Sequence, residues 1–149
     1  MTPPTWEAGL VAFHRRVQEE RMAGVALLNP VLMVAAIGFH DHPLGRLGIL
    51  LTPWCMNLVL RPLDDCAAPG TERERTLSAG HVTFLGYSVE PLGGYEAASL
   101  LTTMEELEDQ PTACAVAEAA LAALLRPPPP QEDASRRDFL RSLLPQAQR

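Results

Sequence analysis

Within residues 31–60 and again within residues 80–101, the connections between strand-like segments are very short, and this spacing constrains the fold more than any other feature. Val, Ile, Leu and aromatic residues concentrate in four segments, at residues 31–39, 47–51, 80–89 and 95–101. Thr52-Pro53-Trp54 interrupts the second segment, and residues 55–60 resume it as a short strand or a helical turn. Because a parallel crossover needs a dozen or more residues, neighbours so close in sequence predict an antiparallel sheet.

Amphipathic patterns predict one helix before the strands and one helix after them along the chain. In residues 6–22 the apolar positions follow steps of four, three and four, with Thr5 as the N-cap. Pro111 stands where first-turn prolines stand, and residues 112–125 form an Ala-rich helix whose expected buried stripe is Cys114, Ala117, Leu121 and Leu124. Residues 40–45 and 66–75 are expected to be a turn and a loop.

The predicted fold class is therefore α+β, with an N-terminal helix, an antiparallel sheet of four to five strands, a C-terminal helix and a Pro-linked tail. We expect one domain over residues 1–126. Pro127 to Pro130 would form a stiff polyproline spacer, so residues 127–149 are predicted to be a spacer followed by a tail.

Composition excludes several classes of function. All 12 basic residues are Arg, so a P-loop lysine and a pyridoxal phosphate Schiff base are excluded. Acidic residues number 18, and a net charge of −6 argues against nucleic-acid binding. The longest apolar stretch, residues 30–39, is about half the length that spans a bilayer, and the N-terminus shows no export signal. We expect a cytoplasmic protein that is not inserted in a membrane.

Two alternative chemistries are open from the residues alone. His40-Asp41-His42 could bind Zn or Ni at a strand end, or could be a polar turn, and no second ligand pair lies near it in sequence. Cys55 or Cys66 could pair with His81 as a nucleophile. The cysteines lack C-x-x-C spacing, so we assign no metal ligand and no cofactor.

Charge is strongly segregated along the chain. No basic residue lies between Arg75 and Arg126, and this interval holds seven acids: Glu90, Glu96, Glu105, Glu106, Glu108, Asp109 and Glu118. They form either a solvated acidic face or a surface that attracts an arginine-bearing partner.

The tail contains Ser135-Arg136-Arg137-Asp138-Phe139-Leu140-Arg141, which looks like the core of a twin-arginine export signal. No apolar region of export-signal length follows it, so we do not expect it to direct export. It is either a short amphipathic segment that docks on the domain through Phe139, Leu140, Leu143 and Leu144, or a mimic of a signal peptide that the domain binds. An exposed tail could also exchange between two copies in a swapped homodimer.

Several segments together resemble one family, the HybE-type (HupJ-type) [NiFe]-hydrogenase assembly chaperones. The most specific is T-P-W-C-M-N-L at residues 52–58, and residues 28–32, 38–39, 80–86, 95–104 and the S-R-R element fit the same pattern. The resemblance covers roughly residues 22–141. One departure is Ser99-Leu100-Leu101-Thr102-Thr103-Met104, where the family often has a proline turn.

The resemblance implies a cytoplasmic accessory protein, not an enzyme, that acts in hydrogenase maturation. Its implied partners are the small or large precursor subunit of a [NiFe]-hydrogenase, including a twin-arginine signal, with other maturation factors as further candidates. A metal donor or sensor for Ni or Zn is the alternative. The residues expected at the partner surface are Thr52, Pro53, Trp54, Met56 and Asn57, with Glu105, Glu106 and Asp109 as acidic contacts and Arg136, Arg137, Phe139 and Leu140 in the tail.

Overall fold

A computed structural model describes residues 5–21 and 28–127 of the 149-residue chain. Its elements are helix α1, six strands and helix α2, in the order α1 (Trp6–Arg21), β1 (Ala35–His42), β2 (Gly45–Leu51), β3 (Met56–Pro62), β4 (Glu72–Leu77), β5 (Gly80–Val89), β6 (Gly93–Leu101) and α2 (Gln110–Leu124). The predicted α+β class is confirmed, and six strands replace the four to five expected.

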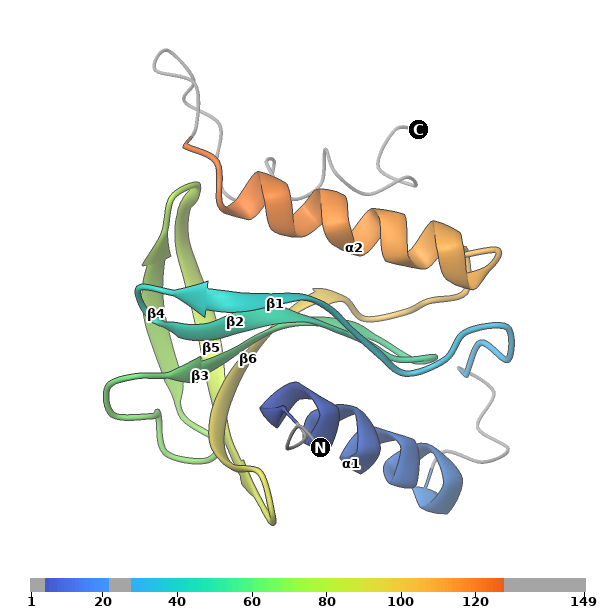
Figure 1. Ribbon diagram of the computed structural model, residues 1–149, viewed down its shortest axis with the longest axis horizontal. Coiled ribbons are helices and arrows are strands. Elements are labelled where there is room, and N and C mark those ends of the chain that lie inside the picture. The colour runs from blue at the N-terminus through green and yellow to red at the C-terminus, as the bar shows by residue number, and fades with distance from the viewer. Residues whose placement is uncertain (1–4, 22–27, 128–149) are drawn as a thin grey trace.

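All six strands form one antiparallel sheet in the order β1-β2-β3-β6-β5-β4. The two helices lie on opposite sides of this sheet, as Figure 1 shows. Among the described residues, no helix has the length and apolar character needed to cross a membrane.

Alternation along the strands divides the core into two clusters. On the α2 side, Ile49, Leu58 and Phe84 are fully buried together with residues of α2. On the α1 side, Leu10 packs with Leu50, Val59 and Tyr95. We call these the α2 face and the α1 face of the sheet. Burial on both faces explains why β2 and β3 are almost continuously apolar, whereas β5 alternates between buried and exposed residues.

The first residues of both helices, and the positions that each helix buries, are close to those that the sequence predicts. The Thr5 hydroxyl accepts a hydrogen bond from the Ala8 N–H at 3.2 Å. Arg15, Arg16, Glu19 and Glu20 are exposed, as expected for the outer side of α1. In α2, Ala117, Leu121 and Leu124 are buried and Cys114 is half-buried.

Two of the expected loops were wrong in part. His40-Asp41-His42 belongs to β1, and the hairpin turn begins only at Pro43. Residues 72–75, expected in a loop, belong to the edge strand β4. The sequence E-R-E-R carries a charge at every position and therefore shows none of the apolar alternation that reveals a half-buried strand. What makes it a strand is its pairing with β5.

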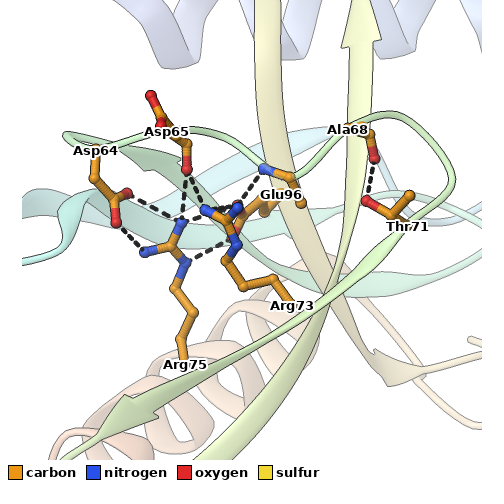
Figure 2. Close-up of polar contacts among 8 residues, drawn as sticks. Asp64, Asp65, Ala68, Thr71, Arg73, Arg75 and Glu96 are labelled. Atoms are coloured by element: carbon orange, nitrogen blue, oxygen red, sulfur yellow. Dashed lines mark hydrogen bonds and ion pairs between the residues drawn. The ribbon is translucent and has the colours of Figure 1, made fainter.

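The connection from β3 to β4 crosses the α2 face over β5 and β6, and a buried ion pair holds it there. Glu96 on β6 is 0 % exposed, accepts two hydrogen bonds from Arg75 at 2.8 and 2.9 Å, and accepts one from the Ala67 N–H at 2.8 Å (Figure 2). Gly86 lies directly beneath, where an added Cβ would stand 2.4 Å from the Ala67 and Ala68 carbonyl oxygens. Only glycine lets the connection approach β5 so closely.

Candidate partner-binding surface

The turn between β2 and β3 is built by Thr52. Its hydroxyl accepts hydrogen bonds from the Trp54 N–H at 3.2 Å and the Cys55 N–H at 2.9 Å, and donates to the Cys55 carbonyl at 3.1 Å. Thr52 is 0 % exposed. Trp54, which this geometry holds at the tip, is only half-buried. The turn therefore presents an indole at the end of the sheet.

Asn29 joins this turn to the acidic loop that precedes α2. Its N–H donates to the Pro53 carbonyl at 2.8 Å, and its side-chain amide donates to the Met104 and Leu107 carbonyls at 2.8 and 2.9 Å. The two groups of residues predicted to bind a partner, separated by about fifty positions in sequence, therefore lie side by side at one end of the sheet. Their pairing could not be derived from spacing.

The acidic loop is anchored by its apolar residues and exposes its charged ones. Met104 and Leu107 are buried, whereas Glu105, Glu106 and Glu108 are exposed. A hollow of about 170 Å³ opens between them, lined by Leu101, Thr103, Glu105, Glu106 and Leu107. The loop therefore combines a small apolar recess with carboxylates at its rim.

Asp109 has a structural role in addition to its charge. It is the N-cap of α2, and its carboxylate accepts a hydrogen bond from the Thr112 N–H at 2.8 Å. This hydrogen bond lowers the pKa of Asp109, so the side chain is held ionised at the helix terminus.

Two exposed apolar residues at this end of the sheet are not among those that the sequence predicts at the partner surface. Val31 is 53 % and Met33 is 61 % exposed, while Leu32 and Val34 between and beside them are buried. The Gln110 side chain holds the Met33 backbone, accepting from its N–H at 2.8 Å and donating to its carbonyl at 3.1 Å. The sequence predicts a strand over residues 31–39, but β1 begins only at Ala35. Residues 31–34 are all apolar, so the sequence does not show which of them are exposed.

We define the sheet-end surface by its accessible residues: Val31, Met33, Trp54, Asn57, Glu105, Glu106 and Asp109. Met56 is 0 % exposed and packs in the core on the α2 face, so it cannot itself contact a partner. Thr52 and Pro53 are also buried and act by shaping the turn. Glu96 is not part of the acidic surface that the sequence predicts, because it is buried against Arg75.

A larger hollow of about 770 Å³ lies at the opposite end of β3, lined by residues that include Trp6, Arg46, Arg61 and Leu63. Arg46 is neutralised there by Glu7 at 2.7 Å and Asp41 at 3.0 Å. Hydrogen bonds from Arg46 accordingly lower the pKa of Glu7. Leu63 is 79 % exposed, and it provides an apolar reference residue far from the sheet-end surface.

The structure gives the metal and nucleophile alternatives little geometric support. The rings of His40 and His42 lie 6.1 Å apart, and no group of three or more His, Cys, Asp or Glu residues within residues 5–21 and 28–127 is placed to hold a metal. Cys55 Sγ contacts Thr52 and Asn57, whereas the His81 ring is bonded to Thr76. Burial raises the pKa of the Cys55 thiol, which keeps it protonated and weakens it as a nucleophile.

Arg136, Arg137, Phe139 and Leu140 of the predicted tail lie outside the described residues. The predicted division at residues 126 and 127 has no direct test in the described structure and stays a prediction.

Fold and surface together define a small α+β domain with a mixed apolar and acidic patch at one end of its sheet. Residues 5–142 match the family described as "[NiFe]-hydrogenase assembly, chaperone, HybE". The chain belongs to this family of hydrogenase assembly chaperones.

Sequence similarity to hydrogenase expression/formation proteins supports this assignment. The hydrogenase expression/formation protein HupT of Azotobacter chroococcum is 40% identical over 114 residues, covering 74% of this chain and 75% of that protein. HupJ of Bradyrhizobium diazoefficiens is 33% identical over 135 residues, covering 89% and 79%. The solution structure of HybE from Escherichia coli shares the fold with a TM-score of 0.68 at 19% identity, over 89% of this chain and 86% of that one.

A protein named probable rubredoxin HupJ, from Rhodobacter capsulatus, is 34% identical over 118 residues. This match covers 76% of the present chain but only 42% of that protein. A rubredoxin-type iron site needs four Cys thiolates, and the 149 residues here hold three cysteines with no C-x-x-C pair. The residues present therefore do not fit such a site.

Proposed function

We propose that this protein binds a segment of a [NiFe]-hydrogenase precursor subunit at the sheet-end surface, in the cytoplasm, until cofactor assembly is complete. The observation that carries the proposal is that the turn bearing the half-buried Trp54 lies beside the acidic loop, with Asn29 hydrogen-bonded to both. Family membership supplies the class of partner.

The chemistry of the surface favours a segment that carries both apolar and arginine side chains. Val31, Met33 and Trp54 offer apolar contacts, and tryptophan is enriched among residues that dominate interface energies. Glu105, Glu106 and Asp109 offer carboxylates to which a guanidinium can donate in pairs. A twin-arginine signal followed by its apolar region combines both features, so we propose the signal of the small subunit as the segment bound.

Trp54→Ala tests this proposal. Removing a half-buried interface indole should weaken binding of a small-subunit signal peptide by at least about tenfold, as for a residue that contributes 1.4 kcal/mol or more. Isothermal titration calorimetry measures the affinity. The peptide with both arginines replaced by alanine should bind the unaltered protein more weakly than the natural peptide binds Trp54→Ala.

Leu63→Ala is the matched control, because it truncates an exposed apolar residue at the opposite end of β3 and should leave the affinity unchanged. If Trp54→Ala and Leu63→Ala bind the peptide equally well, with both proteins folded by circular dichroism, the sheet-end surface is not the binding site. A peptide that does not bind the unaltered protein would refute the signal as the segment bound.

A further inference from the structure

Within the described part of the chain, the α1 face of the sheet is covered over only part of its width. The strand register places Val59, Ala97, Leu85 and Glu72 in one row across β3, β6, β5 and β4. Val59 and Ala97 are buried, Leu85 is half-buried and Glu72 is exposed. The cover given by α1 therefore ends near β6, and on the α1 face Figure 1 shows neither of the two described helices over β4 and β5.

A hollow of about 180 Å³ opens on this uncovered part of the sheet. Its floor includes the small side chains Ala97 and Ser99 and the half-buried Leu85. Asn57, Glu72 and Thr83 add polar groups to the lining, and Tyr87 adds an aromatic ring. Tyr87 is 37 % exposed and stacks on Tyr95, with ring centroids 5.3 Å apart and planes 17° from parallel. The stack fixes the ring that forms one wall.

The Glu72 carboxylate at the rim makes no ion pair with any of the described residues. In β4 the sequence E-R-E-R places Glu72 and Glu74 on the α1 face and Arg73 and Arg75 on the other. Both arginines are engaged there by the Asp65 carbonyl and by acidic partners that include Glu96, as Figure 2 shows. Among the residues that the structure describes, no basic group lies within ion-pair distance of Glu72.

The same hollow offers oxygen acceptors around this carboxylate. The Asn57 amide nitrogen donates to Cys55 Sγ at 3.6 Å, which leaves the Asn57 side-chain oxygen available. Thr83 and Ser99 are exposed and add two hydroxyl groups. One carboxylate, three neutral acceptors and an aromatic face surround a space the size of a single side chain.

We propose that this hollow is a subsite for one arginine side chain of the bound precursor segment. A guanidinium has five donors in a plane, stacks on aromatic rings, and suits a site that combines a carboxylate with acceptor oxygens and Tyr87. A lysine ammonium would supply the positive charge, but it lacks the planar group that stacks on Tyr87 and donates several hydrogen bonds in one plane. The inference rests on the proposed function, because Asn57 belongs to both the hollow and the sheet-end surface.

The first test uses N-acetyl-argininamide as the probe, followed by ¹H–¹⁵N NMR on the full chain. Titration should shift the amide signals of Asn57, Glu72, Thr83 and Tyr87 with millimolar affinity, and the neutral isostere N-acetyl-citrullinamide should shift them far less. Glu72→Gln should weaken the arginine titration by about three- to tenfold, the range for a charged hydrogen bond near a surface.

Glu74→Gln is the matched control, because Glu74 is exposed on the same strand and face but does not line the hollow. It should titrate like the unaltered protein. Equal effects of the two substitutions, equal shifts by arginine and citrulline, or arginine shifts confined to residues 105–109 would each overturn the subsite.

The second test separates this inference from the proposed function. If the signal peptide binds the unaltered protein and Glu72→Gln equally, the subsite is refuted while the proposed function stands. If the peptide does not bind but the arginine probe still titrates the hollow and loses affinity in Glu72→Gln, the signal-peptide proposal fails and the arginine subsite is supported. A threefold or larger loss of peptide affinity in Glu72→Gln alone, with Glu74→Gln unchanged, supports both.

Discussion

At the scale of single residues, adjacent positions of the T-P-W-C-M-N-L block have different structural roles. Thr52 forms the turn, Trp54 is held at its tip, Met56 fills the core and Asn57 borders the open hollow. Met56 and Asn57 differ so sharply because successive strand residues point to opposite faces of the sheet. The block could be found in the sequence, but this division of roles depends on which face each neighbour covers.

The buried pair of Arg75 and Glu96 gives a residue-scale prediction. Arg75→Leu should lower the free energy of unfolding by about 3 kcal/mol, because it leaves the buried Glu96 carboxylate without its hydrogen-bonded guanidinium and with only Arg73, at 3.9 Å, as a cation. Urea denaturation measures the change. The double variant Arg75→Leu/Glu96→Leu should recover part of the loss, and a double variant no more stable than Arg75→Leu would contradict the ion-pair explanation.

The same pair fixes the sign of a pH dependence. Burial alone would raise the pKa of Glu96, but the hydrogen bonds from Arg75 and Ala67 outweigh it and hold the pKa below its ordinary value of 4.5. The stabilisation is therefore complete above about pH 4.5 and is lost as the pH falls through the lowered pKa of the folded state. The unaltered protein should lose stability in this acid range more steeply than the double variant.

At the scale of elements, the loop of residues 102–109 ends β6, starts α2 and forms part of the sheet-end surface. Met104 and Leu107 fix it to the core, and Asn29 bonds its backbone to the rest of the surface. Its conformation is thus determined by the groups that bury it, which leaves its carboxylates free to face outward. Asp109 alone has two assigned roles, as the N-cap and as a charge.

Asp109→Asn separates these two roles. Asparagine caps helices about as well as aspartate, so the Tm should stay within about 1–2 °C of the unaltered protein, whereas Asp109→Ala should lower it by a few degrees. If the charge also contacts the partner, Asp109→Asn should weaken signal-peptide binding about two- to threefold. Full affinity in Asp109→Asn would restrict this residue to capping.

At the scale of the whole molecule, a single sheet separates two cores, and residues 5–21 and 28–127 leave two of its regions without cover. These are the sheet end that carries Trp54 and the α1 face over β4 and β5. Asn57 lies between them, so one extended segment could contact both. The tail, with its S-R-R-D-F-L-R sequence, is a candidate competitor for the same surface from within the chain.

Deleting residues 135–149 tests this competition. If the tail occupies the peptide site of its own domain or of a second copy, its removal should tighten signal-peptide binding severalfold, because an attached competitor acts at high effective concentration. Calorimetry on the full and shortened chains measures the difference, and replacing Arg136 and Arg137 by alanine in the full chain should reproduce it. Unchanged affinity in the shortened chain would exclude the tail as an inhibitor.

The sequence by itself determined the helices, most strands and the antiparallel arrangement, because these follow from local apolar periodicity, turn residues and short connections. Its resemblance to the hydrogenase assembly chaperones also located the family. Local patterns failed for β4, whose fully charged E-R-E-R carries no periodic signal, and for the His40–His42 turn, which pairing with β2 extends as strand.

Only the tertiary structure decided which of the predicted surface residues are accessible. It buried Met56 and Glu96, exposed Val31 and Met33, and joined the Trp54 turn to the acidic loop through Asn29. It also separated the two charges of β4, since Glu96 and the Asp65 carbonyl engage its arginines on the α2 face, whereas Glu72 and Glu74 form no ion pair with the residues that the structure describes. Such outcomes depend on contacts between residues far apart in the chain, which no local pattern records.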